Sequence, residues 1–225
     1  MDARVLFRKH HLLESHHGKG TFIRSLPRGG RILDVGCGNE SPAYFKWLRH
    51  DLYYIGIDVA DYYQDALSIR AADEYHITAS GGFVEAINRF CGSMDGVVSS
   101  HNLEHCDDYR AVLKAMVGVL KPGGRMYLAF PSEASTHFPH RRGCLNFFDD
   151  STHRHLLSWQ AVVEDLHAFG MVFEFSARRY RPLIPAFFGL LFEPVSALRN
   201  EVLRTGGTWA LYGFETVIWA MRRGQ

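Results

Sequence analysis

The chain has 225 residues, of which 47% are hydrophobic and 22% are charged, a balance typical of globular domains. With 25 basic and 24 acidic residues its formal charge is only +1, which excludes a broadly basic surface for nucleic acid. Because no signal peptide, membrane span or Cys-x-x-Cys pair is found, we expect one cytoplasmic domain over 1–225 with reduced thiols.

Short apolar strands alternate with helical stretches along the chain. A helical lead-in over 5–26 fills most of an N-terminal segment, 1–30, that ends in Pro27 and a glycine pair. The pattern then predicts strands at 31–35, 53–59, 74–78, 95–99, 125–130, 171–175 and 209–221, and helices at 41–49, 82–90, 109–120 and 158–169. Ser41 and Pro42 mark the cap and first turn of one helix, and Lys-Pro-Gly-Gly at 121–124 ends another. This alternation predicts an α/β fold with a doubly wound, mostly parallel sheet.

A glycine turn follows the first of these strands. Gly36 and Gly38 allow a ligand to approach the backbone closely, and Asp58 ends the next strand, where a carboxylate can accept both hydroxyls of a ribose. The position of the third glycine in a pyrophosphate-binding loop is Ser41, and Asp34 just before the turn would repel a pyrophosphate. The turn therefore favours a nucleoside cofactor other than NAD, and an NAD-dependent oxidoreductase is disfavoured.

Four segments in this order, LDVGCGN, GIDV, DGVVSSHNLEH and LKPGGRMYLAFP, resemble the motifs of class I S-adenosylmethionine-dependent methyltransferases. The resemblance covers 31–131, the expected cofactor-binding core, and implies a Rossmann-like sheet of seven strands with an antiparallel last strand. It implies S-adenosylmethionine as methyl donor, with its methionyl part beside Asp34, Gly36 and Gly38 and its ribose on Asp58. The full set of cofactor-binding residues expected from it is Asp34, Gly36, Cys37, Gly38, Asp58, Val59, Ser99 and Ser100. The aspartate that often contacts the adenine in this family is missing, and Thr78 or Ser80 could replace it.

Transfer of a methyl group to a hydroxyl benefits from a base, and four residues are candidates for catalysis. His101 and His105 follow the fourth expected strand, while Asp150 and His153 lie in the long segment 132–158, which we expect to form a lid over the acceptor. The alternative for this segment is that its aspartates cap the next helix. No spacing among these histidines and carboxylates compels a metal site, so the sequence predicts none.

Within 132–158, NFFDDSTHRHLLS resembles, more weakly, methyltransferases of polysaccharide and glycolipid pathways. The sequence therefore predicts O-methylation of a glycan or another small hydroxylated acceptor. Two alternatives stay open, an N- or O-methyltransferase of small metabolites or natural products, and a catalytically silent cofactor-binding partner subunit. The insertion 181–208 carries an apolar stretch, 183–192, that could pack on the sheet edge, contact a membrane peripherally or form a homodimer.

Overall fold

A seven-stranded sheet in the order β3-β2-β1-β4-β5-β7-β6 forms the centre of the molecule. The computed structural model describes residues 16–38, 40–61, 70–203 and 205–224. The strands are β1 (Arg31–Val35), β2 (Tyr53–Asp58), β3 (Glu74–Ile77), β4 (Met94–Ser100), β5 (Leu120–Pro131), β6 (Met171–Ala177) and β7 (Glu215–Arg222). β1 to β5 pair in parallel, whereas β7 runs antiparallel between β5 and β6. This topology confirms the predicted doubly wound sheet and its antiparallel last strand.

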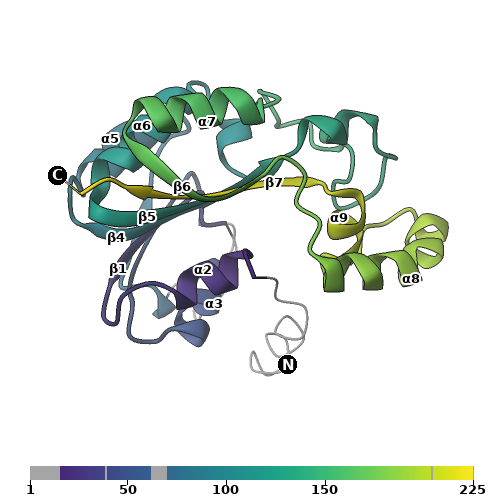
Figure 1. Ribbon diagram of the computed structural model, residues 1–225, viewed down its shortest axis with the longest axis horizontal. Helices are drawn as coiled ribbons and strands as arrows, with labels where there is room; N and C mark the ends of the chain where they lie inside the picture. Colours follow the sequence, from purple (N-terminus) through teal and green to yellow (C-terminus); the bar gives the residue numbers. More distant parts are fainter. Residues whose placement is uncertain (1–15, 39, 62–69, 204, 225) are drawn as a thin grey trace.

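Helices cover both faces of the sheet (Figure 1). The helices α5 (Phe83–Asn88), α6 (Tyr109–Val119) and α7 (Trp159–Ala168) lie on one face, and α2 (Lys19–Arg24) and α3 (Ser41–Leu48) lie on the other. Successive residues of a strand point to opposite faces of the sheet. Ile32 accordingly packs with α2 and α3, while its neighbour Leu33 packs with α5 and α6. Two further helices, α8 (Leu183–Arg199) and α9 (Gly207–Tyr212), lie beyond the end of the sheet where β5 finishes and β7 begins.

Most expected elements are found within one or two residues of their predicted bounds, and the exceptions are described in turn. Helix α3 is capped by Glu40 in a left-handed conformation (φ 65°), because the hydroxyl of Ser41 donates instead to Asp34 Oδ2 at 2.6 Å. The Lys-Pro-Gly-Gly segment does not precede β5 but lies inside it, at the shift in pairing with β4. Of the lead-in over 5–26, residues 5–15 lie outside the described part of the chain, and α2 occupies Lys19–Arg24.

The last strand begins later than predicted. Trp209, expected to open it, lies in α9, and Gly213 in the left-handed region (φ 66°) ends that helix before β7 starts at Glu215. The indole N–H of Trp209 donates to the Cys144 carbonyl oxygen at 2.7 Å, and its ring stacks on Phe214. The same ring lies 5.0 Å from that of His101, so Trp209 stands at the end of the sheet where β4 finishes.

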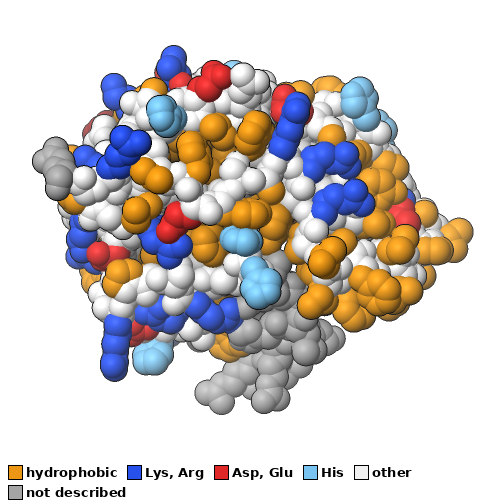
Figure 2. All heavy atoms as spheres, viewed as in Figure 1, with side chains coloured by type: hydrophobic (Ala, Val, Ile, Leu, Met, Phe, Trp, Pro, Cys, Tyr) orange, Lys and Arg blue, Asp and Glu red, His pale blue; other side chains and the backbone are white. Residues whose placement is uncertain are grey.

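Helix α8 exposes an apolar surface that we call the α8 surface. Leu183 and Leu198, near its two ends, are 87% and 88% exposed. Seven further members of this surface are between 39% and 60% exposed: Ile184, Phe187, Phe188, Leu190, Leu191, Phe192 and Val195. Figure 2 shows apolar side chains gathered at this end of the molecule, with Lys and Arg side chains beside them. Among the described residues, no helix is long and apolar enough to cross a membrane.

Candidate active site

The turn between β1 and α3 is held close to the end of β2. The backbone N–H groups of Gly36 and Cys37 both donate to the carbonyl oxygen of Ile57, at 2.9 and 3.3 Å. Gly36 (φ 71°) backs onto the Asn102 side chain, so that a Cβ atom there would lie 2.3 Å from Cγ of Asn102. Gly38 (φ 58°) faces the other way, and a Cβ atom there would meet nothing within 4 Å. The turn is therefore packed on one side and open on the other.

Asp58, at the end of β2, lies beside the open side of the turn. It is only 4% exposed. Its Oδ2 accepts a hydrogen bond from the Gly38 N–H at 2.6 Å, and its Oδ1 accepts one from the Val59 N–H at 2.7 Å. A carboxylate offers about four acceptor positions, so each oxygen keeps one for a ligand.

A cavity of about 460 Å³, the glycine-loop cavity, opens beside this turn. It lies at the carboxyl ends of β1, β2 and β4, where ligands of doubly wound sheets bind. Its lining comprises Gly36, Gly38, Asp58, Val59, Ser80, Phe83, His101, Asn102, His105, Cys106, Asp150, Thr152 and Arg154. The open space at Gly38, the spare acceptor positions of Asp58 and the apolar wall of Val59 and Phe83 fit the ribose and adenine of an adenosyl cofactor. Ser80, one of the two residues considered for the adenine, is on this wall, and Thr78 is not.

Three of the residues expected to bind the cofactor lie behind the turn and line neither this cavity nor the second one described below. The carboxylate of Asp34 accepts hydrogen bonds from Ser41 and Tyr54, and burial raises its pKa above the ordinary value. Burial and two nearby carboxylates raise the pKa of the Cys37 thiol, which stays protonated. Ser99 is buried as well. These side chains support the turn from within the core.

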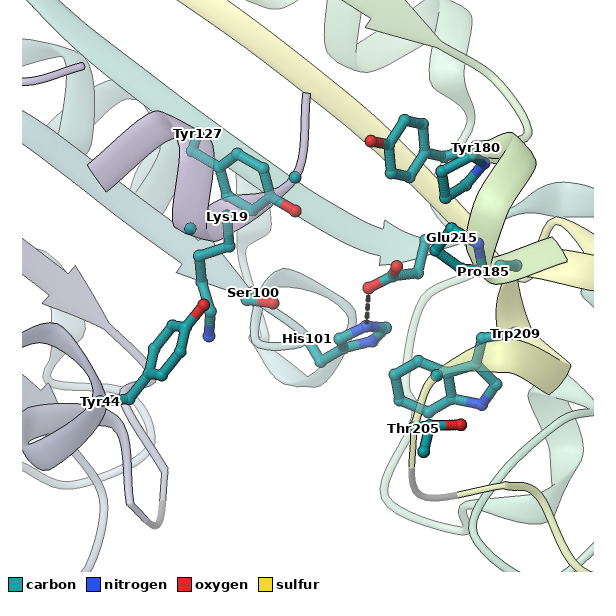
Figure 3. Close-up of a pocket in the computed structure, with 15 residues that line it drawn as sticks. Lys19, Tyr44, Ser100, His101, Tyr127, Tyr180, Pro185, Thr205, Trp209 and Glu215 are labelled. Carbon is teal, nitrogen blue, oxygen red and sulfur yellow. Dashed lines mark hydrogen bonds and ion pairs between the residues drawn. The ribbon is translucent and has the colours of Figure 1, made fainter. Parts of the chain in front are cut away.

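His101 follows β4 and stands between two carboxylates. Its Nε2 lies 2.9 Å from Glu215 Oε1 and its Nδ1 lies 3.3 Å from Glu104 Oε1 (Figure 3 draws the first pair). The sheet creates this contact, since Ser100 on β4 pairs with Ala129 on β5, and Pro131 on β5 pairs with Glu215 on β7. Burial alone would lower the pKa of His101, but the hydrogen bonds to both carboxylates outweigh it and raise the pKa to about 10. His101 is therefore protonated at neutral pH and donates both hydrogen bonds.

A second cavity, of about 470 Å³, lies on the other side of His101. We call it the tyrosine cavity, and Figure 3 shows its aromatic side chains and Glu215 facing a shared space. Its lining comprises Gly18, Lys19, Gly20, Tyr44, Ser100, His101, Tyr127, Tyr180, Pro182, Pro185, Thr205, Gly206, Trp209, Ala210 and Glu215. His101 lines this cavity and the glycine-loop cavity alike, so one side chain is in reach of ligands in both.

The segment 132–158 is fixed by its own polar groups. Asp149 Oδ2 accepts hydrogen bonds from the backbone N–H groups of Arg141, Leu145 and Asn146, and the Arg141 guanidinium forms a buried ion pair with Glu193 of α8. Asp149 thus organises its own loop and does not cap α7, which begins at Trp159.

The other candidate catalytic residues lie away from the tyrosine cavity. Asp150 and His105 line the glycine-loop cavity, and His153 lines neither cavity. Asp150 Oδ1 accepts hydrogen bonds from the backbone and hydroxyl of Thr152. Burial raises the pKa of Asp150, but these hydrogen bonds outweigh it and hold the pKa below its usual range. Of the four predicted residues, His101 alone reaches both cavities.

Comparison with known proteins assigns the fold. Residues 33–128 match a family model described as "Methyltransferase domain". An S-adenosylmethionine-dependent methyltransferase from Mesorhizobium loti superposes with a TM-score of 0.59 at 18% identity, covering 90% of this chain and 96% of its own. Residues 33–128 therefore match a methyltransferase domain, and the chain has the fold of class I S-adenosylmethionine-dependent methyltransferases.

Relatives of this methyltransferase domain match over part of their length. The O-methyltransferase rstn1 of Aspergillus nomiae is 32% identical over 111 residues, which are 45% of this chain and 47% of the relative. The 27-O-demethylrifamycin SV methyltransferase of Amycolatopsis mediterranei is 30% identical over 122 residues, 48% of this chain and 43% of the relative. The chain thus spans about half the length of the curated relatives that it matches. Neither of these two is named as a polysaccharide-pathway enzyme, so the weaker resemblance stays a prediction.

The sequence analysis did not identify several residues that line the two cavities. Glu215 and Trp209 line the tyrosine cavity together with His101, although both follow the insertion 181–208 and are far from His101 in the sequence. Lys19 comes from α2 and Tyr44 from α3, the two helices that cover the face of the sheet away from α5, α6 and α7. Glu104 stands in the LEH segment singled out for its histidine, and a carboxylate directly before that histidine was the signal available for it.

Proposed function

We propose that the protein transfers a methyl group from S-adenosylmethionine bound in the glycine-loop cavity. When bound, this cofactor supplies the methyl group on a positively charged sulfur. Asp58 would accept hydrogen bonds from the two ribose hydroxyls through its spare acceptor positions, and Val59 and Phe83 would pack on the adenine. Support comes from the open space at Gly38 and the position of Asp58 in the lining of the cavity.

The acceptor, in this proposal, occupies the tyrosine cavity. The observation that carries it is that His101 lines both cavities, so donor and acceptor meet at one side chain. Placing the two reactants on either side of a fixed group provides the alignment on which methyl transfer depends. Three tyrosines and Trp209 in the lining offer ring faces for sugar or aromatic acceptors, and Glu215 offers a hydroxyl-binding carboxylate.

We assign removal of the acceptor's proton to Glu215. Its carboxylate lines the tyrosine cavity and is held by His101 at 2.9 Å. A carboxylate beside the acceptor hydroxyl can take its proton as the carbon–oxygen bond forms. His101, held at its other nitrogen by Glu104, positions this carboxylate.

The acceptor that fits best is a small hydroxylated molecule, a glycan or glycolipid first. The α8 surface adds to this preference, because Pro182 and Pro185 at the start of α8 line the tyrosine cavity. The side chains of Arg178, Arg179 and Arg181 are exposed just before the helix. Apolar side chains flanked by cationic ones match an anionic membrane surface. We propose a peripheral contact with the cytoplasmic face of a membrane, which would present a lipid-linked acceptor to the cavity.

The test measures formation of S-adenosylhomocysteine with a panel of glycosides, glycolipids, phenols and amines. We expect turnover with a hydroxylated acceptor and a fall of roughly 10²-fold in kcat for Glu215→Gln, with unchanged affinity for S-adenosylhomocysteine. Glu133→Gln is the matched control, because this carboxylate pairs with Arg178 outside both cavities and should leave turnover unchanged. Cofactor binding without turnover on any acceptor would instead favour the silent partner subunit, and turnover on amines alone would favour the N-methyltransferase.

A further inference from the structure

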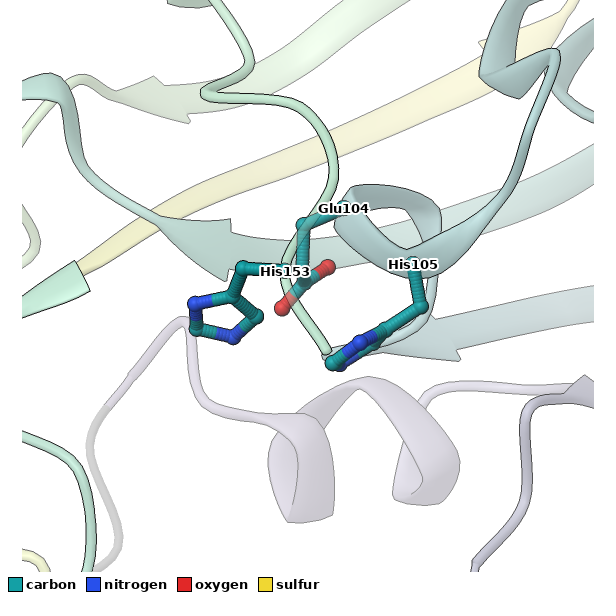
Figure 4. A group of neighbouring side chains, drawn as sticks. All are labelled: Glu104, His105 and His153. Atoms are coloured by element: carbon teal, nitrogen blue, oxygen red, sulfur yellow. The ribbon is translucent and has the colours of Figure 1, made fainter. Parts of the chain in front are cut away.

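The strongest unassigned feature is a group of three side chains beside the glycine-loop cavity. Glu104, His105 and His153 each offer one ligand atom, and these atoms all lie within 4.8 Å of one another (Figure 4). Glu104 and His105 come from the short 3₁₀ turn η1 (Leu103–His105), and His153 comes from the segment 132–158. The backbone holds the two segments together, since the Glu104 carbonyl oxygen accepts hydrogen bonds from the Arg154 and His155 N–H groups.

Only one oxygen of the Glu104 carboxylate has a hydrogen-bond partner among the described residues. It is 0% exposed, and its Oε1 accepts a hydrogen bond from His101. Its Oε2 is equally buried and has no hydrogen-bond partner among the residues that the structure describes. A buried carboxylate oxygen without a partner costs free energy, and a cation bound to it removes that cost.

Both histidines have one ring nitrogen held by a backbone carbonyl oxygen. His153 Nδ1 lies 2.6 Å from the Phe147 carbonyl oxygen, and His105 Nδ1 lies 3.1 Å from the Thr152 carbonyl oxygen. A carbonyl only accepts, so Nδ1 carries the proton in each ring, and in the neutral ring Nε2 keeps its lone pair. Metal-binding histidines make this same second hydrogen bond to a carbonyl or carboxylate, which fixes their tautomer and orientation.

We propose that Glu104, His105 and His153 bind a divalent transition-metal ion, with Zn²⁺ as the first candidate. Two imidazoles and one carboxylate form the ligand set of zinc sites that keep a fourth position open. With bonds of about 2.1 Å, two ligands of one ion lie at most about 4.2 Å apart, so the side chains need to close only slightly. Asp150 Oδ2, 4.0 Å from His153 Nε2, adds a second carboxylate to the neighbourhood.

Such an ion would join the segment 132–158 to the turn after β4. It would also lie one hydrogen bond from the proposed reaction centre, because Glu104 contacts His101 through its other oxygen. The site does not depend on the proposed methyl transfer, since its ligands can be tested without cofactor or acceptor. Because His105 and His153 are far apart in the sequence, no spacing of residues predicted this metal site.

The test is metal binding to the untagged full-length chain after dialysis against EDTA. Titration calorimetry with Zn²⁺ and the visible absorption of the Co²⁺ complex should report one ion per chain, and Zn²⁺ should raise Tm. His153→Gln and His105→Gln should each weaken binding at least about a hundredfold and abolish the shift in Tm. His137→Gln, which removes an exposed histidine of the same segment, should bind as the wild type does.

Two results would overturn the proposal. One is wild-type protein that takes up no Zn²⁺ or Co²⁺. The other is binding that is unchanged in both variants, which would place the ion elsewhere, for example on the N-terminal histidines 10, 11, 16 and 17. Far-UV circular dichroism of each variant separates loss of a ligand from loss of the fold. Binding of S-adenosylhomocysteine, measured with and without EDTA, shows separately whether the proposed cofactor site is intact.

Discussion

Replacing Asp58 by alanine tests the proposed cofactor site most directly. The variant removes two acceptors for ribose hydroxyls, and a hydrogen bond to a charged group contributes about 1.5 kcal/mol or more. We therefore expect a loss of about 3 kcal/mol, or roughly a 10²-fold weaker Kd for S-adenosylhomocysteine by titration calorimetry. Asp58→Asn should lose affinity too, because its amide N–H₂ would face the N–H of Gly38 or Val59, each of which now donates to a carboxylate oxygen.

A matched control separates the ligand contact from support of the backbone. Asp51 also accepts a hydrogen bond from a glycine N–H, that of Gly29 at 2.8 Å, but it lines neither of the two cavities. Asp51→Ala should therefore lower stability, measured by urea unfolding, and leave the affinity for S-adenosylhomocysteine as it is. Affinity of Asp58→Ala within about threefold of the wild type would refute the assignment of the ribose site, provided that the fold is intact.

Two further predictions concern the glycine turn and the α8 surface. Gly36→Ala should lower the free energy of unfolding by about 3 kcal/mol or more, because its Cβ would clash with Asn102, whereas Gly38→Ala should cost only the about 1–2 kcal/mol of a left-handed residue. Equal losses for the two variants in urea unfolding would contradict this geometry. A double variant, Leu183→Glu with Leu190→Glu, should reduce co-sedimentation with anionic phospholipid vesicles at least tenfold. If the wild type ignores vesicles and this variant instead dissociates a dimer by light scattering, the α8 surface is a contact between copies of the chain.

The order of strands and helices was predictable because it depends on local patterns. Apolar strands such as 31–35 and 53–58 are short and continuous, and glycine or proline marks the segments between them. The errors fall where a tertiary contact overrides a local preference. Ser41 left the cap position because a buried carboxylate accepts its hydroxyl hydrogen, and Trp209 joined a helix because its indole finds a carbonyl oxygen and a ring to pack on.

The residues of the proposed cofactor site were largely predictable from the sequence. Gly36 and Gly38 lie within three residues of the end of β1 and Asp58 ends β2, so their approach needs only the parallel pairing of neighbouring strands. Even there, the sequence did not separate residues that line the cavity from those behind it. Asp34 and Cys37 belong to the same LDVGCGN motif, yet both side chains are buried behind the turn and do not line the cavity.

By itself, then, the sequence determined the α/β sheet, the glycine turn and the acid that faces it, because each depends on residues close together in the chain or on neighbouring parallel strands. Only the tertiary structure decided what surrounds His101 and Glu104. Glu215 arrives through the antiparallel pairing of β7 with β5, and His153 arrives through hydrogen bonds between its loop and the backbone of Glu104. Contacts between residues 47 or 114 positions apart leave no periodic signal in a single sequence, since these residues meet only when the sheet and its connecting loop have packed.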